Sequence, residues 1–261
     1  MKTTVGDIEL HYTIEGAGPW ITLSHSLGCD SSMWDEQAAL LSKNYTVLRF
    51  DTRGHGQSSA PPGPYTLAQM ADDVHGLFQF LGIKKTHWLG ISMGGMIGQT
   101  FALKYPGVFS SMVLLDTTSR RPPNASAIWG QRIELAQSQG MGALVESTLE
   151  RWFTAPFRAS HPQVVAKVAQ GIRDTPVAGF CGCCEAISEI DVLDRLPEID
   201  CPALVMVGDQ DHGTPPEMAR LIHQNLRNSK FVIIPDAAHI SNIEQPVFFN
   251  RELLAFLHQQ H

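Results

Sequence analysis

Short apolar runs alternate with longer helix-like stretches through most of this chain, and this alternation restricts the possible folds more than any other feature. The apolar runs cover residues 46–50, 87–91, 111–115, 203–207 and 231–234, and the main helix-like stretches cover residues 66–81, 94–105, 216–226 and 246–258. Strands of a parallel sheet appear as continuous apolar runs because helices cover both faces of the sheet. The alternation therefore predicts an α/β fold with a doubly wound, mostly parallel sheet.

The N-terminal region has a different pattern. Residues 4–15 and 20–25 alternate polar and apolar side chains, and Gly16-Ala17-Gly18-Pro19 separates the two segments. A period of two residues is typical of strands with one covered face, and Gly and Pro favour turns. We therefore expect strand, turn and strand before the α/β part begins.

Residues 120–196 interrupt this alternation of strand-like and helix-like stretches, because they contain amphipathic helix candidates but no convincing strand. The interruption begins at the Pro-containing linker Ser119-Arg120-Arg121-Pro122-Pro123-Asn124 and ends near Leu196-Pro197. We predict a helical cap at 120–196, inserted into a core formed by residues 1–119 and 197–261. Such a cap would cover the crevice at the carboxyl ends of the strands, where ligands bind in these folds.

Charge and cysteine content exclude several classes of function. The chain has 19 Lys and Arg against 26 Asp and Glu and no basic stretch, which argues against binding nucleic acid or an anionic membrane. Neither a basic and apolar leader nor an apolar run of membrane-spanning length is present, so we expect a cytoplasmic protein. Cys181, Cys183 and Cys184 cluster, but no second cysteine pair or spaced histidines complete a metal site. We expect neither a metal nor a disulfide framework.

The segment Gly90-Ile91-Ser92-Met93-Gly94 matches the pattern G-x-S-x-G between a strand-like run and a helix-like stretch. In this context the serine lies on a strained turn that requires small neighbours. Its hydroxyl stands at a helix N-terminus, where developing negative charge is stabilised. We predict that Ser92 is a nucleophile.

A serine nucleophile needs a histidine base, which a carboxylate orients. His239 follows the last strand-like run after a short loop, which places it at the same sheet edge as Ser92. For the acid, Asp211 lies further into the loop after residues 203–207 than Asp209 does, so it can bend toward His239. Asp209 and Asp116, which follows residues 111–115, stay open as alternatives.

The intermediate of acyl transfer also needs hydrogen-bond donors for its oxyanion. In this type of fold one donor is the N–H after the nucleophile and the other lies in an early strand-to-helix loop. We assign them to Met93 and Leu27. His25 is expected to anchor the early loop, and Arg53 and His55 to brace the site through hydrogen bonds without touching substrate.

With these residues in place, the chain resembles the α/β-hydrolase superfamily and, within it, the 3-oxoadipate enol-lactonases. The similar segments span nearly the whole chain: His25-Ser26-Leu27-Gly28, Ser32-Met33-Trp34-Asp35, Asp51-Thr52-Arg53-Gly54-His55-Gly56, Pro61-Pro62-Gly63-Pro64-Tyr65, Gly90-Ile91-Ser92-Met93-Gly94-Gly95-Met96, Trp129-Gly130-Gln131-Arg132-Ile133, Arg151-Trp152-Phe153-Thr154, Thr214-Pro215-Pro216 and Ala238-His239-Ile240-Ser241-Asn242-Ile243-Glu244. The resemblance implies an eight-stranded sheet with an inserted cap. It also supports Asp211 as the acid and Leu27 with Met93 as the oxyanion hole.

The resemblance implies that the chain opens 3-oxoadipate enol-lactone, a small molecule, to 3-oxoadipate in the β-ketoadipate pathway of aromatic catabolism, without a cofactor. The implied substrate carries a carboxylate, which Arg132 could bind through two hydrogen bonds, with Trp129 and Trp152 shaping the pocket. One segment departs from the family: the last cap helix reads Ala186-Ile187-Ser188-Glu189 where the family often carries Arg after Ala-Ile.

Three alternatives remain at this point. The same triad would serve a carboxylesterase or perhydrolase that acts on neutral esters. A carbon–carbon bond hydrolase of the meta-cleavage type would use it too. The third alternative is a receptor that keeps the fold only to bind a ligand, which the complete set of predicted catalytic residues disfavours.

Overall fold

Eight strands form one sheet in the computed structural model, which describes residues 1–260; His261, the last residue of the predicted core, lies outside them. The sheet order is β1-β2-β4-β3-β5-β6-β7-β8. The strands are β1 (Lys2–Val5), β2 (Ile8–Glu15), β3 (Trp20–Ser24), β4 (Thr46–Phe50), β5 (Thr86–Ile91), β6 (Phe109–Leu115), β7 (Ala203–Gly208) and β8 (Ser229–Ile234). All pairings from β4 to β8 are parallel, whereas β1 and β2 join antiparallel. The predicted mostly parallel sheet is confirmed.

The prediction of one strand over residues 4–15 is wrong, because a tight turn splits it into β1 and β2. Gly6 adopts a positive φ of 57° there, and β1 pairs back onto β2. The turn at Gly16 and Gly18 does not close a hairpin either, because β2 pairs with β4 and the chain crosses to β3 on the far side of β4. A Cβ on Gly16 would lie 2.3 Å from the Tyr45 carbonyl oxygen, so this crossing requires glycine.

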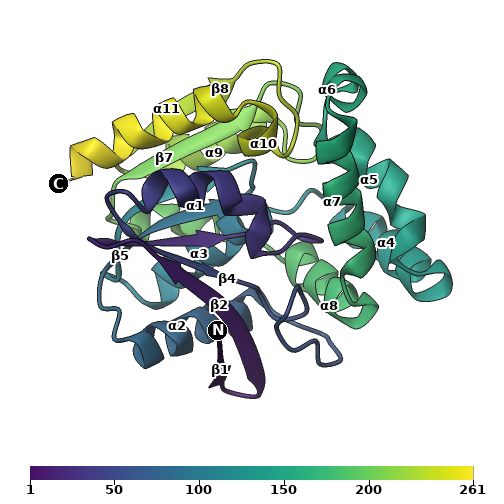
Figure 1. Ribbon diagram of the computed structural model, residues 1–261, viewed down its shortest axis with the longest axis horizontal. Coiled ribbons are helices and arrows are strands. Elements are labelled where there is room, and N and C mark those ends of the chain that lie inside the picture. The colour runs from purple at the N-terminus through teal and green to yellow at the C-terminus, as the bar shows by residue number, and fades with distance from the viewer. Residues whose placement is uncertain (261) are drawn as a thin grey trace.

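Helices cover both faces of the sheet (Figure 1). Those outside the segment between β6 and β7 are η1 (Ser31–Trp34), α1 (Asp35–Leu41), α2 (Leu67–Leu81), α3 (Met93–Lys104), α9 (Pro216–Asn225), α10 (Ser241–Glu244), α11 (Pro246–Leu257) and η4 (His258–Gln260). On one face α1 packs with α11, and the Gln37 amide donates to Asn250 at 3.1 Å. On the other face α2 packs on α3, and α9 joins them through the 3-10 helix η3 (Leu193–Glu198). Every residue of β5 and β7 is buried, which is expected where helices cover both faces of the sheet.

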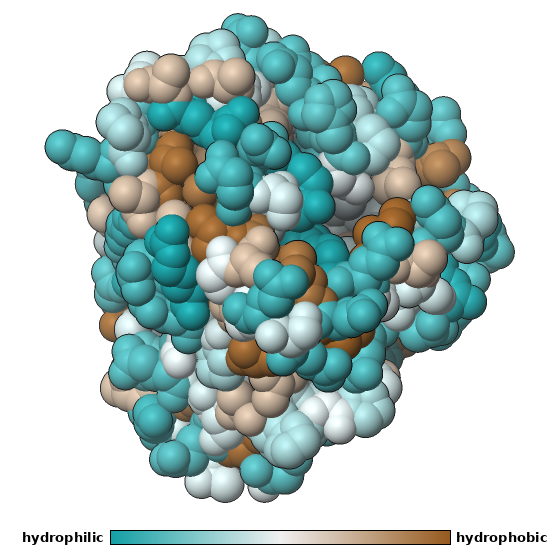
Figure 2. All heavy atoms as spheres, turned by 90° about the vertical axis from the view of Figure 1, so that its right-hand side faces the viewer, coloured by the Kyte–Doolittle hydropathy of each residue, from teal (hydrophilic) through white to brown (hydrophobic). Residues whose placement is uncertain are grey.

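The segment between β6 and β7 is helical. It contains α4 (Ala125–Gln139), η2 (Met141–Leu144), α5 (Val145–Trp152), α6 (Ala155–Ser160), α7 (Pro162–Asp174) and α8 (Val177–Ser188). A bridge between Arg120 and Asp191 joins its two ends, and the Arg120 side chain donates to Asp191 at 2.8 Å. These helices gather on one side of the sheet (Figure 1), and their outer face carries mostly hydrophilic side chains with small apolar patches between them (Figure 2). The division into core and cap at residues 120 and 196 stays a prediction.

Burial on both faces makes β7 sensitive to loss of side-chain volume. Leu204 in β7 is fully buried, whereas Leu221 in α9 is 45% exposed. We expect Leu204→Ala to lower the free energy of unfolding by about 2–5 kcal/mol, because it leaves a cavity. Leu221→Ala, the matched control, should change it by about 0.5 kcal/mol or less. Urea unfolding followed by circular dichroism measures both values. Equal effects of the two substitutions would contradict the burial of β7 by helices on both faces of the sheet.

Candidate active site

Ser92 occupies a sharp turn between β5 and α3. Its backbone has φ 52° and ψ −116°, which confirms the predicted strained conformation. The surrounding backbone leaves no room for side chains at the two neighbouring glycines. A Cβ on Gly90 would lie 2.3 Å from the Gly94 carbonyl oxygen, and a Cβ on Gly94 would lie 2.3 Å from the Ser24 carbonyl oxygen. The turn therefore requires glycine at positions 90 and 94, and it packs against the end of β3.

Ser92, His239 and Asp211 form a continuous hydrogen-bonded chain. The Ser92 Oγ lies 3.0 Å from His239 Nε2, and His239 Nδ1 lies 2.8 Å from Asp211 Oδ2. The three residues come from the turn after β5, the loop after β8 and the loop after β7. Because an ionised carboxylate only accepts, Nδ1 carries the proton of the neutral ring and Nε2 is left to accept from the serine. This arrangement can remove the hydroxyl proton as a bond forms at Ser92 Oγ.

Asp211 is buried and held by three donors in its own loop. The N–H groups of Gly213 and Thr214 donate to Oδ1 at 2.8 and 3.0 Å, and the Thr214 hydroxyl donates to Oδ2 at 2.7 Å. Burial opposes ionisation, but the charge and hydrogen bond of His239 and the bonds from Thr214 outweigh it, so the pKa of Asp211 is lowered. The role of Thr214 was not predicted, although a hydroxyl residue three positions after an aspartate is a recognisable turn signal.

The pKa of His239 shifts in the opposite direction from that of Asp211. Its burial would lower the pKa of the ring, but the facing charge and hydrogen bond of Asp211 outweigh burial and raise the pKa above 6.5. A raised pKa makes the unprotonated Nε2 a stronger base toward the Ser92 hydroxyl.

Neither alternative acid forms a hydrogen bond with the His239 ring. The exposed Asp209 accepts the N–H of Ala237 at 3.2 Å. Asp116 is fully buried and accepts from the Gly208 N–H at 2.9 Å and from the Ser241 hydroxyl at 2.6 Å. Burial and the nearby charge of Asp211 raise the pKa of Asp116 to about 8. Asp116 thus ties together the loops that carry Asp211 and His239.

Two buried histidines fix the early loop. The Thr52 N–H donates to His25 Nε2 at 2.9 Å, and His25 Nδ1 donates to the Ser26 carbonyl at 2.8 Å. The Gly28 N–H donates to His55 Nε2 at 2.9 Å. Burial lowers the pKa of both rings, that of His55 to about 3, so both are neutral anchors.

These anchors decide which N–H groups near Ser92 are available. Gly28 is already used by His55. Within residues 1–260 the N–H groups of Leu27 and Met93 donate to no protein acceptor. These two are the predicted oxyanion donors, and their role stays a prediction.

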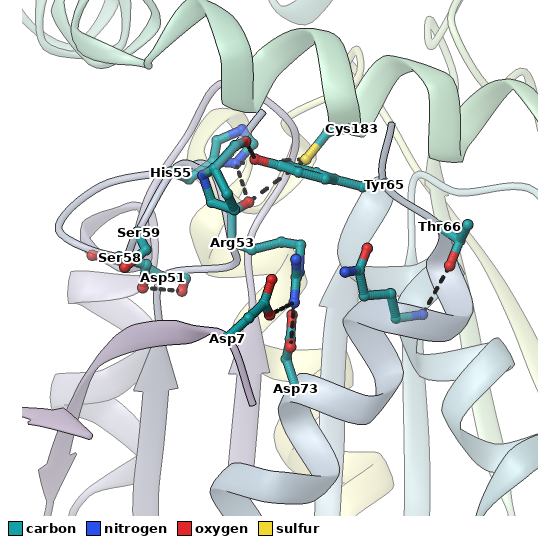
Figure 3. Close-up of polar contacts among 12 residues, drawn as sticks. Asp7, Asp51, Arg53, His55, Ser58, Ser59, Tyr65, Thr66, Asp73 and Cys183 are labelled. Carbon is teal, nitrogen blue, oxygen red and sulfur yellow. Dashed lines mark hydrogen bonds and ion pairs between the residues drawn. The ribbon is translucent and has the colours of Figure 1, made fainter. Parts of the chain in front are cut away.

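Arg53 lies behind the loop that carries His55. Its side chain donates to both carboxylate oxygens of Asp73, at 2.5 and 2.7 Å, and to Asp7 at 3.2 Å, and it packs over the ring of Tyr65 (Figure 3). The Arg53 carbonyl oxygen lies 3.3 Å from His55 Nδ1. Arg53 therefore braces the loop, as expected, and none of its hydrogen bonds or ion pairs reaches Ser92.

The helical segment is attached to the loop of His239. The Ile240 N–H donates to the Trp152 carbonyl at 3.2 Å. The buried Glu244 accepts from the Thr154 N–H at 3.0 Å and from its hydroxyl through one oxygen, and from the Ala238 N–H at 2.9 Å through the other. Glu244 thus joins the helical segment to the histidine loop, a role that was not predicted.

The predicted substrate-binding residues fall into two groups. The Arg132 Cζ lies over the Trp129 ring, 5.0 Å from its centre, and over the Phe180 ring at 5.7 Å. The Trp152 ring lies 6.4 Å from that of His239. The structure therefore brings Trp152 to the histidine, whereas Arg132 makes no hydrogen bond to Ser92, His239 or Asp211.

An apolar groove of about 540 Å³ lies between α7 and residues 28–36. Gly28 and Ile240, which neighbour Leu27 and His239 in sequence, line one part of the groove, and Val164 and Val168 line another. Among residues 1–260 no group of three or more His, Cys, Asp or Glu side chains is arranged to hold a metal ion, and no described helix is long and apolar enough to cross a membrane.

Comparison with known protein families gives a fold that agrees with the mostly parallel sheet and the strained serine turn. The family described as alpha/beta hydrolase fold matches residues 19–246. This chain belongs to that family. It is a hydrolase, and its relatives are enzymes that act on small molecules.

Its relatives include lactonases and an esterase. The hydrolase is 35% identical to 3-oxoadipate enol-lactonase 2 of Acinetobacter baylyi, over 97% of this chain and 95% of the relative. The crystal structure of the enol-lactonase from Burkholderia xenovorans LB400 matches 99% of this chain with its full length, at 39% identity and a TM-score of 0.95. A thermophilic esterase from Thermogutta terrifontis, solved with malate bound, matches with a TM-score of 0.94 at 33% identity, over all of this chain and 98% of the esterase.

The buried histidines should titrate differently. NMR titration of the ring protons, assigned with His239→Gln and His55→Gln, should give His239 a pKa above 6.5, and Asp211→Asn should lower it because the negative charge beside Nδ1 is removed. His55 should stay neutral at every pH well above its value of about 3. A pKa of His239 below 6.5, or one that Asp211→Asn leaves unchanged, would contradict the described electrostatics.

Proposed function

We propose that this hydrolase opens 3-oxoadipate enol-lactone to 3-oxoadipate, a step of the β-ketoadipate pathway of aromatic catabolism. The observation that carries the proposal is the hydrogen-bonded chain from Ser92 through His239 to Asp211 in a chain similar to two enol-lactonases over nearly its whole length. The five free cysteines suit a reducing compartment, which supports a cytoplasmic location.

The reaction begins with attack of Ser92 Oγ on the lactone carbonyl carbon while His239 Nε2 takes the hydroxyl proton. The N–H groups of Leu27 and Met93 bind the oxyanion of the tetrahedral intermediate. The intermediate collapses, the ring C–O bond breaks, and His239 returns the proton to the leaving enol oxygen, after which the enol ketonises.

Water completes the cycle. His239, again neutral, takes a proton from a water molecule that attacks the acyl group on Ser92, and the second collapse releases the product carboxylic acid and restores the serine hydroxyl. Throughout, ionised Asp211 stabilises the positively charged ring that forms twice in each turnover. Serine chemistry of this kind needs no cofactor.

Substrate recognition in this proposal depends on the helical cap. The lactone carries a free carboxylate, and Arg132 on α4 offers a planar guanidinium that can bind it through two hydrogen bonds. Burial and the neighbouring Arg151 lower the pKa of Arg132 to about 10, so it stays protonated at neutral pH. Trp129 and Trp152 would limit the size of the pocket.

A second candidate is a carboxylesterase that acts on neutral esters. The similarity to the Thermogutta esterase and the apolar lining of the groove beside the site favour it. The two candidates differ in whether a carboxylate on the substrate matters.

The test is steady-state hydrolysis of enzymatically generated 3-oxoadipate enol-lactone and of p-nitrophenyl acetate by the wild type and by Ser92→Ala. We expect kcat/KM for the lactone to exceed that for the ester by at least about tenfold, the worth of one charge-assisted contact. Ser92→Ala should lower kcat on the lactone by about 10⁴-fold or more, because the nucleophile is lost. Ester hydrolysis without lactone turnover would support the esterase and reject the lactonase.

A further inference from the structure

Two arginines of the helical segment lie together without a counter-ion. Arg132 on α4 and Arg151 on α5 both donate to the Thr148 hydroxyl oxygen, at 3.2 and 3.3 Å. Neither forms an ion pair with an Asp or Glu within residues 1–260. By contrast, Arg121 in the same segment pairs with Glu189 at 2.6 Å.

This pair is energetically costly in the free protein. Both arginines are half-buried, and Thr148, which joins them, is buried. Burial, and for Arg132 also the repulsion from Arg151, lowers the pKa of the two side chains. Two partly desolvated like charges at one hydroxyl group are unfavourable unless an anion joins them.

Most of their donors are unused. A guanidinium has five N–H donors, and Arg132 makes one hydrogen bond, through Nη2 to Thr148. Its Nε is buried and has no partner. The Arg132 Cζ lies over the rings of Trp129 and Phe180. Apart from the bond to Thr148, the N–H groups of Arg132 have no hydrogen-bond acceptor among residues 1–260, so they are free to bind an oxyanion.

The surroundings do not neutralise the charge. The buried thiol of Cys184 lies close enough to influence Arg132, but burial raises the pKa of that thiol, so it is uncharged at neutral pH. Thr148 contributes a neutral hydroxyl. No Asp or Glu side chain within residues 1–260 therefore neutralises either arginine through an ion pair.

One arginine of the pair, Arg151, lies close enough to His239 to affect its charge. Arg151 immediately precedes Trp152, whose ring is 6.4 Å from that of His239, and the positive charge of Arg151 acts to lower the pKa of His239. Arg151 is thus the member of the pair whose charge reaches the active site.

We propose that Arg132 and Arg151 form a single carboxylate-binding subsite, in which the substrate's carboxylate bridges the two guanidinium groups beside the Thr148 hydroxyl. The carboxylate supplies the missing counter-ion, and Arg151 makes the enzyme select esters and lactones that carry a carboxylate near the scissile bond. The identity of the lactone rests on the proposed function, whereas the subsite itself requires only an anionic ligand.

The subsite is tested by calorimetric binding of adipate, a six-carbon dicarboxylate, to Ser92→Ala, which separates binding from turnover. In that background, Arg132→Gln and Arg151→Gln should each weaken adipate binding about tenfold or more, because each removes a charge-assisted contact. Arg121→Gln is the matched control, because Glu189 already neutralises Arg121, and it should bind adipate as the background does. Unchanged binding in Arg151→Gln would overturn the proposal, even if the lactone is turned over.

Thermal unfolding distinguishes a binding role from a structural one. Without adipate, Arg151→Gln should unfold at the same or a higher temperature than the background, because repulsion with Arg132 is removed. Adipate should raise the unfolding temperature of the background and of Arg121→Gln, but much less that of Arg151→Gln. Arg151→Lys, which keeps the charge but not the planar fork, should recover part of the binding. Loss of stability in Arg151→Gln without adipate, together with an undiminished adipate shift, would show that Arg151 is structural.

Discussion

The strained backbone at Ser92 is the constraint on which the rest of the site depends. A non-glycine residue at φ 52° is unfavourable by about 1–3 kcal/mol, so the surrounding structure must hold it there. The Ser92 N–H donates to the Leu115 carbonyl at 2.9 Å, and the Thr117 hydroxyl donates to the Ser92 carbonyl at 2.7 Å. Both partners belong to β6 or follow it directly, so a buried parallel neighbour keeps the turn in place and its hydroxyl directed at His239.

Buried carboxyl groups hold the loops around this turn. Asp116 connects the end of β7 to the residue two positions after His239, and Glu244 connects the same histidine loop to Thr154 in the helical segment. Asp51 accepts the N–H groups of Ser31 and Gln57, at 2.8 and 2.9 Å. Hydrogen bonds from backbone N–H groups to these buried carboxyl groups hold the loops in place, which preorganises the site before substrate arrives.

Much of this arrangement could be predicted from local sequence. The apolar runs identified the parallel strands, and the glycines around Ser92 identified the turn, because only small residues fit there. The N-terminal hairpin was missed although a signal exists: the buried Val5 and Ile8 are three positions apart, which breaks the period of two at Gly6. Glu244 and the pairing of Arg132 with Arg151 could not be predicted in this way, because they join residues that only the three-dimensional packing brings together.

The most direct test of the account is the site of covalent modification by a fluorophosphonate, a reagent that reacts with an activated serine. Intact-mass measurement should show one adduct per chain, peptide mapping should place it on Ser92, and His239→Ala should abolish labelling because the base is lost. Lactone and ester turnover should fall in proportion to labelling. Full turnover by a labelled enzyme, or an adduct on any residue other than Ser92, would contradict the assignment of Ser92 as the nucleophile.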